Sequence, residues 1–257
     1  MLNETFYLDG IDARSAGIQL QAPIEFSEAV PVVEAQTIPG RNGDLIWETG
    51  SYENRSGSAS CFCLQKDVEK AISSAGRFLM GKKGYRRLET SDDPDHYWMA
   101  RVENSPQIAM RLRTLAPFEI GFDCKPQRFV KAGENPIVFN NDLSSEILSK
   151  GISLTIFNQY GFDALPLIKV YFFENAPGDY LYFINENGEK WEIFIENSNG
   201  HIYLDCDTQN AYNESGSMNT KIQCKEFPVF SLGETVITTE FTDCVKKIEI
   251  IPRWWEL

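Results

Sequence analysis

Short apolar runs separated by turn-forming residues recur along the chain, and several of them alternate in polarity with a period of two. This pattern is typical of β-strands that bury one face. The strands predicted in the first half are Thr5–Leu8, Gly17–Leu20, Val32–Ile38, Leu45–Trp47, Ser58–Leu64, Arg86–Glu89, Tyr97–Val102 and Glu119–Asp123. Asp9-Gly10 and the turn-rich segment 38–44 predict hairpins, because these residue types favour tight turns. Lys125-Pro126 is expected to end the last strand, because proline cannot donate to a ladder.

One helix is predicted after the strand at Ser58–Leu64. Apolar residues recur there at spacings of three or four, which places them on one helical face. They are Leu64, Val68, Ile72, Ala75 and Leu79. Gly81 and Gly84 follow and predict the end of the helix.

The second half contains no helical pattern. Its predicted strands are Ile152–Phe157, Ile168–Phe173, a three-strand meander over Tyr180–Cys206, Val236–Phe241 and Lys247–Ile251. In the middle strand of the meander, Trp191, Ile193 and Ile195 face one way, and the intervening residues face the other. Short strands at steady intervals predict a β-sandwich.

The segment Lys131–Pro136 has little to bury and predicts a domain boundary. A length of 257 residues accommodates two domains, which we expect at 1–130 and 131–257. The predicted fold is mainly β with one helix, comprising an α+β N-terminal domain and a C-terminal β-sandwich.

The formal net charge of −13 narrows the range of partners. An acidic surface repels phosphate, so neither sequence-specific nucleic-acid binding nor docking on an anionic membrane is expected. No apolar run approaches the ~20 residues that a spanning helix needs. Residues Met1–Glu4 lack the basic and apolar parts of a signal peptide, so synthesis in a cytoplasm is expected.

The histidines do not form a recognisable catalytic arrangement. His96 and His201 are the two histidines of the chain and fall in different predicted domains. A nucleophilic triad needs a base within hydrogen-bonding reach of a serine or cysteine. We therefore favour partly exposed structural roles for both residues over catalysis.

Clusters of metal-binding residue types are also incomplete. Cys61 and Cys63 lie two apart on one predicted strand face, but structural zinc needs four ligands, so two buried thiols are favoured. The acidic turn Asp92–Asp95 lacks the glycine and distal glutamate of a calcium loop, so a solvated turn is favoured. Glu192 and Glu196 form a conceivable glycosidase pair, but solubility explains them better. We predict no catalytic residue, no metal site and no cofactor.

Several segments, in order and over nearly the whole chain, resemble the distal tail proteins of siphophages that infect Gram-positive bacteria. They are Phe6–Asp12, Gly17–Leu20, Ile38–Leu45, Tyr85–Glu89, Asp92–Asp95, Tyr97–Val102, Ile202–Asp205, Phe227–Phe230 and Pro252–Leu257. The chain departs from the family at Leu232–Thr235, where the family often carries Pro-Gly and Asn. The N-terminal half is the more specific part of the match.

The resemblance implies a structural protein of the virion tail tip. In the family, the N-terminal domain assembles into a hexameric ring that docks on the tail tube, and isolated rings can stack back to back. The C-terminal domain is a galectin-like β-sandwich. The implied partners are further copies of the chain, the major tail tube protein, the tail-associated hub protein and, at the rim, receptor-binding proteins. DNA passes through the centre of the ring.

Two groups of residues are candidates for assembly. Gly40, Arg41, Asn42 and Gly43 occupy the predicted hairpin turn, where the glycines allow left-handed geometry and Arg41 offers a bidentate contact. Such a hairpin can add to the sheet edge of a neighbour, although an ordinary surface hairpin is an equal alternative. Arg253, Trp254 and Trp255 are interface-prone types, but closure of the sandwich core is the favoured interpretation.

Two other functions stay open. A carbohydrate-binding module would use aromatic and polar groups on a sheet face, although Trp191-Glu192 alone does not make the galectin sugar pattern. A hydrolase acting on cell wall is the third hypothesis. Both are as compatible with a monomer as with a ring, whereas the tail-tip hypothesis requires a closed oligomer.

Overall fold

The computed structural model describes residues 4–64, 68–103, 115–140, 153–176, 178–196, 200–239 and 244–257. The chain forms two compact units, Met1–Arg128 together with Leu257, and Phe129–Glu256. Strands predominate in both, and the first unit contains the α-helix. The predicted class, mainly β with one helix, is confirmed. No helix among the described residues is long and apolar enough to cross a membrane.

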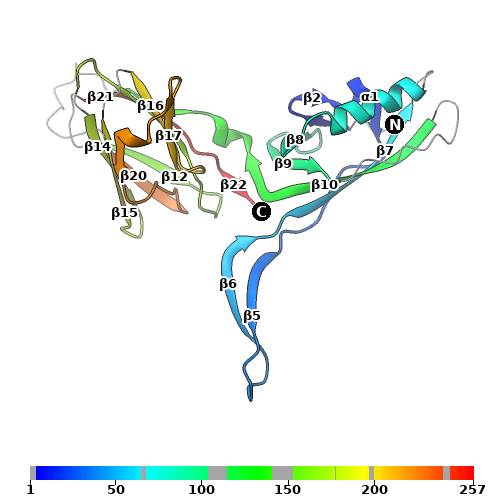
Figure 1. Ribbon diagram of the computed structural model, residues 1–257, viewed down its shortest axis with the longest axis horizontal. Coiled ribbons are helices and arrows are strands. Elements are labelled where there is room, and N and C mark those ends of the chain that lie inside the picture. Colours follow the sequence, from blue (N-terminus) through cyan, green and yellow to red (C-terminus); the bar gives the residue numbers. More distant parts are fainter. Residues whose placement is uncertain are drawn as a thin grey trace. The chain divides into compact units, whose positions relative to one another are not determined.

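The first unit is built around one mixed-length antiparallel sheet (Figure 1). Its strands are β1 (Phe6–Leu8), β2 (Ile11–Asp12), β3 (Ile18–Leu20), β4 (Glu25–Phe26), β7 (Arg55–Leu64), β8 (Arg86–Thr90), β9 (His96–Val102) and β10 (Leu115–Val130). The order is β2-β1-β8-β9-β10-β7-β3, with β4 also beside β7. The turn predicted at Asp9-Gly10 joins β1 to β2, and both residues have positive φ. A 3-10 helix, η1 (Ala13–Ala16), leads into β3.

The end predicted for β10 is wrong. The strand continues through Lys125 and Pro126 to Val130. Its ladder with β7 stops at Cys124, which pairs with Arg55. Pro126 therefore lies beyond that ladder, where its missing N–H breaks no hydrogen bond to β7.

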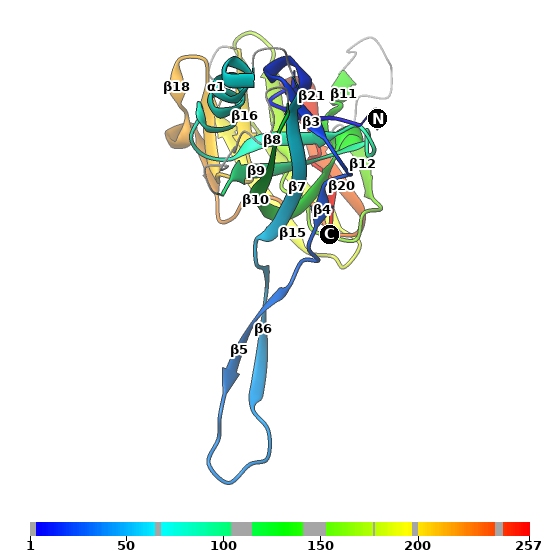
Figure 2. The ribbon, with the colours of Figure 1, turned by 90° about the vertical axis from the view of Figure 1, so that its right-hand side faces the viewer.

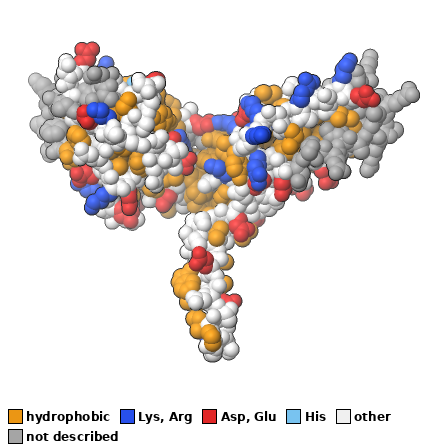
Figure 3. Space-filling model, in the orientation of Figure 1, with side chains coloured by type: hydrophobic (Ala, Val, Ile, Leu, Met, Phe, Trp, Pro, Cys, Tyr) orange, Lys and Arg blue, Asp and Glu red, His pale blue; other side chains and the backbone are white. Residues whose placement is uncertain are grey.

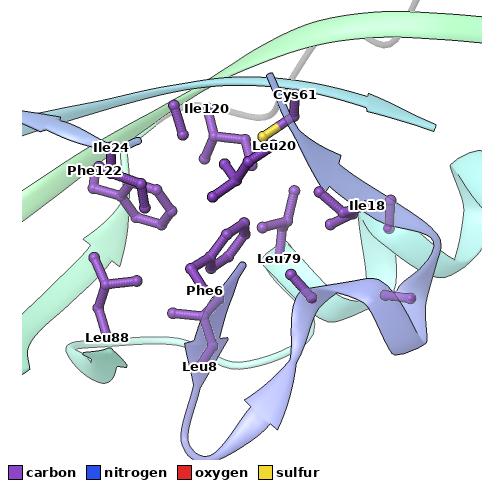
Figure 4. Packing of buried hydrophobic residues seen from close by; sticks show 14 of the residues in the cluster. Phe6, Leu8, Ile18, Leu20, Ile24, Cys61, Leu79, Leu88, Ile120 and Phe122 are labelled. Carbon is purple, nitrogen blue, oxygen red and sulfur yellow. The ribbon is translucent and has the colours of Figure 1, made fainter. Parts of the chain in front are cut away.

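The predicted helix is confirmed as α1 (Val68–Met80). Ala71, Ala75 and Leu79 are fully buried, and Ile72 packs against the same core. Leu64 is not part of the helix, contrary to the prediction, because it pairs with Leu115 as the last residue of β7. Figure 4 shows the core between the helix and the sheet, where Phe6 meets Phe122 edge to face at 5.8 Å.

The predicted hairpin around residues 38–44 is also confirmed. It consists of β5 (Pro31–Gln36) and β6 (Leu45–Tyr52), which pair only with each other as a separate two-stranded sheet. Figure 2 shows the hairpin extending away from the main sheet of its unit.

The second unit is a sandwich of two antiparallel sheets, as predicted. One sheet has the order β11-β21-β13-β16-β17-β18 and the other β12-β20-β14-β15-β19. The strands are β11 (Ile137–Asn140), β12 (Ser153–Asn158), β13 (Leu167–Phe172), β14 (Gly178–Asn185), β15 (Lys190–Glu196), β16 (His201–Asp205), β17 (Asn210–Asn213), β18 (Gly216–Ser217), β19 (Ile222–Cys224), β20 (Gly233–Thr239) and β21 (Val245–Ile251). The short strand β22 (Trp255–Glu256) belongs to neither sheet of the sandwich and pairs with β10. Two 3-10 helices, η2 (Lys131–Glu134) and η3 (Asn219–Lys221), complete the unit. Residues 152, 240 and 241, at the ends of predicted strands, lie outside the described part.

The three-strand meander predicted over Tyr180–Cys206 is wrong in its last step. β14 pairs with β15, but β16 pairs with β13 and β17 in the opposite sheet. Ile195 on β15 and Ile202 on β16 are both fully buried in one core, which they enter from opposite sheets. The predicted alternation within β15 is confirmed, because Ile193 and Ile195 point inward and Trp191 packs against the same core.

Candidate assembly surface

The β5–β6 hairpin has no hydrophobic core of its own. Every residue from 31 to 52 is exposed or half-buried. Val33, Ile46 and Trp47 are 50%, 60% and 49% exposed. Figure 3 shows hydrophobic side chains on the surface of this hairpin. An isolated two-stranded hairpin is at best marginally stable in water, so burial of these side chains against another surface would stabilise it.

The register assigns each hairpin side chain to one of two faces. Val33 pairs with Glu48, and Ala35 pairs with Ile46, so these four side chains share one face. Glu34 pairs with Trp47 on the opposite face. Each face thus presents one carboxylate beside large apolar side chains.

The four residues predicted as an oligomer interface lie together at the tip of the hairpin. Gly40 and Gly43 have φ values of 84° and 81°, the left-handed region that glycine adopts without a steric penalty. The Arg41 N–H donates to the Ile38 carbonyl at 3.1 Å and closes the turn. Gly40, Arg41, Asn42 and Gly43 are all exposed. The Arg41 side chain is therefore presented to solvent by a defined turn.

The second predicted group, Arg253 to Trp255, lies within the sandwich unit. Trp254 is 7% exposed and belongs to the core cluster. The Arg253 guanidinium donates to Asp205, with Nη1 to Oδ1 at 2.6 Å. Trp255 stacks on Phe162 with centroids 4.5 Å apart. All three side chains therefore make contacts within the second unit.

The candidate metal and catalytic residues are engaged in structural contacts. Cys61 and Cys63 are buried, and burial raises the pKa of the Cys61 thiol to about 12. His96 Nδ1 lies 2.6 Å from Asp93, which also accepts from Arg128. Burial opposes ionisation of Asp93, but hydrogen bonds from His96 and Arg128 outweigh it and lower its pKa. Within the described ranges, no group of three or more His, Cys, Asp or Glu residues is arranged to hold a metal ion.

Of the two acidic residues considered as a glycosidase pair, Glu196 is held by Lys221 at 2.5 Å. Glu192 lies on the outer face of β15, opposite Tyr182 on β14. Both residues are exposed. Glu192 lines a pocket together with Tyr180 and Trp191, but Glu196 is not part of that lining, so the two carboxylates do not share one site.

An aromatic and basic surface on β13, β16 and β17 was not anticipated from the sequence. The His201 ring lies 5.2 Å from both Tyr171 and Tyr203, and Tyr203 stacks on Tyr212 at 5.1 Å. The Lys169 ammonium lies 4.8 and 4.7 Å from the Tyr171 and Tyr203 ring centroids. The alternation of Leu167–Phe172, with every second residue buried, is the sequence signal that places Lys169 and Tyr171 outside.

No protein-family model matches the chain. No curated protein matches it either. Among solved structures, the chain is similar to the Dit protein of phage SPP1, described as a paradigm of the hub adsorption apparatus in phages that infect Gram-positive bacteria. That match has a TM-score of 0.69 and 13% identity, and covers 97% of this chain and 98% of that chain.

A chain of the phage P2 baseplate in its activated, Ca-containing conformation is also similar. It has a TM-score of 0.54 and 10% identity, and the match covers 97% of this chain and 98% of that chain. Two hub or baseplate chains thus share this fold over nearly their full lengths. The resemblance to siphophage distal tail proteins is confirmed at the level of the fold.

Proposed function

We propose that this chain is a structural hub protein of a phage tail tip, which works by assembling with further copies of itself and with other tail proteins. One observation carries the proposal. The chain has the fold of the SPP1 Dit protein over 97% of its length, and that shared architecture spans both compact units rather than one common domain.

The hairpin supports self-assembly on independent physical grounds. It exposes three large apolar side chains along two strands with unpaired outer edges. Exposed edges of this kind recruit another strand or are covered by a partner. In a closed ring, each copy presents one surface to the next copy and receives a different one. A projecting arm on one side of each copy fits this heterologous contact.

The proposed assembly is a hexameric ring, alone or as back-to-back rings in isolation. Its faces contact the major tail tube protein and the tail-associated hub protein, and receptor-binding proteins attach at the rim. The first unit forms the ring and the galectin-like second unit lies outside it. The chain is synthesised in the host cytoplasm and incorporated into the virion tail tip.

This role needs no reactive centre. His96 and His201 lie within hydrogen-bonding distance of Asp93 and Glu214, Asp93 also forms an ion pair with Arg128, and Cys61 and Cys63 are buried. We propose that the protein is not an enzyme. Incubation with purified peptidoglycan is expected to release no fragments, and sustained release would contradict this.

The assembly can be tested by comparing the full chain with a variant in which residues 31–52 are replaced by a short glycine-serine turn. The hairpin ends are already joined, since the Glu53 N–H donates to the Val30 carbonyl at 2.9 Å. No buried residue is removed, so the variant should fold. Light-scattering mass and negative-stain imaging should show six-fold rings for the full chain and monomers for the variant. A full chain that is monomeric at high concentration, with and without tail tube protein, would refute the proposal.

Carbohydrate binding is the second candidate, and the outer surface of β13, β16 and β17 favours it. Sugar sites use aromatic faces flanked by polar groups, and Tyr171, His201 and Tyr203 lie next to one another there. A glycan array should then give binding that is lost in Tyr203→Ala. An array without binding removes this candidate and leaves the assembly proposal untouched.

A further inference from the structure

A cavity of about 470 Å³ lies in the first unit, beside β4, β7 and β9. Its apolar part is formed by Ile24, Phe26 and Trp98. Its polar part includes two guanidinium groups, Arg55 and Arg128. The two arginines differ in one respect: Arg128 is paired with a carboxylate and Arg55, among the described residues, is not.

Arg128 is already engaged by a carboxylate. It donates to Asp93 through Nε at 3.1 Å and Nη2 at 2.6 Å. Asp93 is fixed in turn by His96. The positive charge of Arg128 therefore has its counter-charge within the unit.

Arg55 has no such partner, although it is the more deeply buried of the two. The residue is 7% exposed, and its Nε donates to the Ser27 carbonyl at 2.7 Å. Its Nη1 is buried and has no hydrogen-bond acceptor among the described residues, and Arg55 forms no ion pair with any of them. A buried charge without a counter-charge is unfavourable, so the position favours an anion.

Trp98 provides a second unsatisfied donor that lines the same cavity. Its indole ring stacks on Phe26 with centroids 4.2 Å apart and planes 15° apart, which fixes the ring. Its Nε1 is buried and donates to no acceptor in the described part of the chain. An indole N–H can only donate, so this wall also lacks an acceptor.

The residues around Arg55 and Trp98 indicate which kind of acceptor would fit the cavity. A guanidinium and an indole N–H together suit an oxygen anion. The cavity is also lined by Glu28, Asp92, Asp93 and Leu257, and Leu257 forms no ion pair with Arg55. The negative charges of this lining disfavour a phosphate with nearly two charges more than a carboxylate with one. Ile24 and Phe26 add apolar surface that a small hydrated ion would leave uncovered. A carboxylate side chain flanked by apolar neighbours satisfies both parts of the cavity.

We propose that this cavity binds a carboxylate from the β5–β6 hairpin of a second copy of the chain, supplied by Glu34 or Glu48. The proposal rests on the assembly proposed above. Glu34 shares its hairpin face with Trp47, and Glu48 shares the opposite face with Val33 and Ile46. Each face combines one acid with exposed apolar side chains. Each hairpin face therefore offers an acceptor of the kind that Arg55 Nη1 and Trp98 Nε1 do not have among the described residues.

The test uses the full chain and four single variants: Arg55→Met, Trp98→Phe, Glu34→Gln and Glu48→Gln. Arg55→Met removes a buried unpaired charge but keeps an apolar side chain of similar length, so the monomer should stay folded with an unchanged or higher melting temperature. Assembly should weaken about tenfold or more per contact, as expected when one partner of a buried charge pair is removed. Trp98→Phe keeps the ring stack and removes the donor, so it should weaken assembly less.

The double variants identify the source of the carboxylate. One glutamate variant should weaken assembly alone and have no further effect in the Arg55→Met background, since the two residues form one contact. Glu119→Gln, an exposed acid on β10, removes the same charge elsewhere and serves as the control. Assembly should be measured as native mass against protein concentration.

A second experiment measures the melting temperature of the dissociated protein. It compares acetate and propionate with chloride at equal ionic strength. Carboxylate-specific stabilisation that disappears in Arg55→Met supports the site even if no ring forms. Such stabilisation without any effect of Glu34 or Glu48 on assembly refutes the hairpin as the source. Normal assembly of Arg55→Met together with no carboxylate effect overturns the site, while ring formation itself stays intact.

Discussion

Arg253 reaches Asp205 from a left-handed backbone conformation, with φ of 59° and Nη1 2.6 Å from Oδ1. The Arg253 N–H also donates to the Gly133 carbonyl at 2.9 Å. The pair therefore joins the last residues of the sandwich to the end of β16 and to η2. This is a structural ion pair, in which both side chains are mostly shielded from solvent.

The pair makes the second unit sensitive to acid. Burial acts to raise the pKa of Asp205, but the hydrogen bonds from Arg253 outweigh it, so the folded-state pKa lies below 3.8. A lowered carboxyl pKa stabilises the fold above the unfolded pKa, and this stabilisation is lost as pH falls through the folded value. Asp205→Asn should lower the free energy of unfolding by about 1–3 kcal/mol near pH 7. The difference in this free energy between the variant and the wild type should shrink below about pH 4. Urea unfolding at several pH values measures this, with exposed Asp163→Asn as the control. A difference in unfolding free energy that does not change with pH would contradict the role of the ion pair.

Gly133 should not tolerate a side chain. A Cβ at this position would lie 2.5 Å from the backbone nitrogen of Trp254, a contact that a flexible side chain cannot relieve. Gly133→Ala should destabilise the second unit by about 1–3 kcal/mol. Gly76→Ala is the matched control, because a Cβ there meets nothing within 4 Å, and in the interior of α1 it should stabilise by about 0.5–1 kcal/mol. Equal melting temperatures for the two variants would contradict the packing argument.

Local pattern predicted the helix, many of the strands and their buried faces, because these follow from residue spacing. Short strands such as β11, β17 and β19 were not predicted. Ile193 and Ile195 were placed inside by alternation alone, and α1 by its apolar spacing. The pairing of β16 with β13 was not predicted, because which sheet a strand joins depends on contacts far apart in sequence.

The cavity around Arg55 shows the same limit. The predicted strand began at Ser58, so Arg55 was not placed on any face. On the observed β7 it lies an even number of residues before Cys61 and Cys63 and shares their buried face. The sequence could not show that its guanidinium lacks a carboxylate. That depends on the positions of Phe26, Ser27 and Trp98, which two other parts of the chain bring to it.

Three deeply buried thiols should be almost unreactive in the folded protein. Burial raises the pKa of Cys61 and Cys124 to about 12 and also raises that of Cys206, so little reactive thiolate forms near neutral pH. Cys224 is only half-buried and should react first. Timed iodoacetamide labelling with peptide mapping should modify Cys224 well before these three, and all should react in denaturant. Rapid labelling of native Cys61 would show that β7 opens readily.

The tip of the hairpin provides the last test, because it changes assembly without touching a core. Arg41 is exposed on a turn fixed by two positive-φ glycines, so Arg41→Glu should leave the circular dichroism spectrum and melting temperature of the monomer unchanged. Reversing the charge should weaken the oligomer, since a guanidinium that contacts a neighbour's carboxylate becomes a repelling group. Arg41→Lys is the control, because it keeps the charge and loses the bidentate geometry, and should give an intermediate oligomer. Mass measurements over a concentration series distinguish the three proteins. Identical assembly would show that the tip contacts no neighbour, and the arm would then act through the sides of the hairpin at Glu34, Trp47 and Glu48.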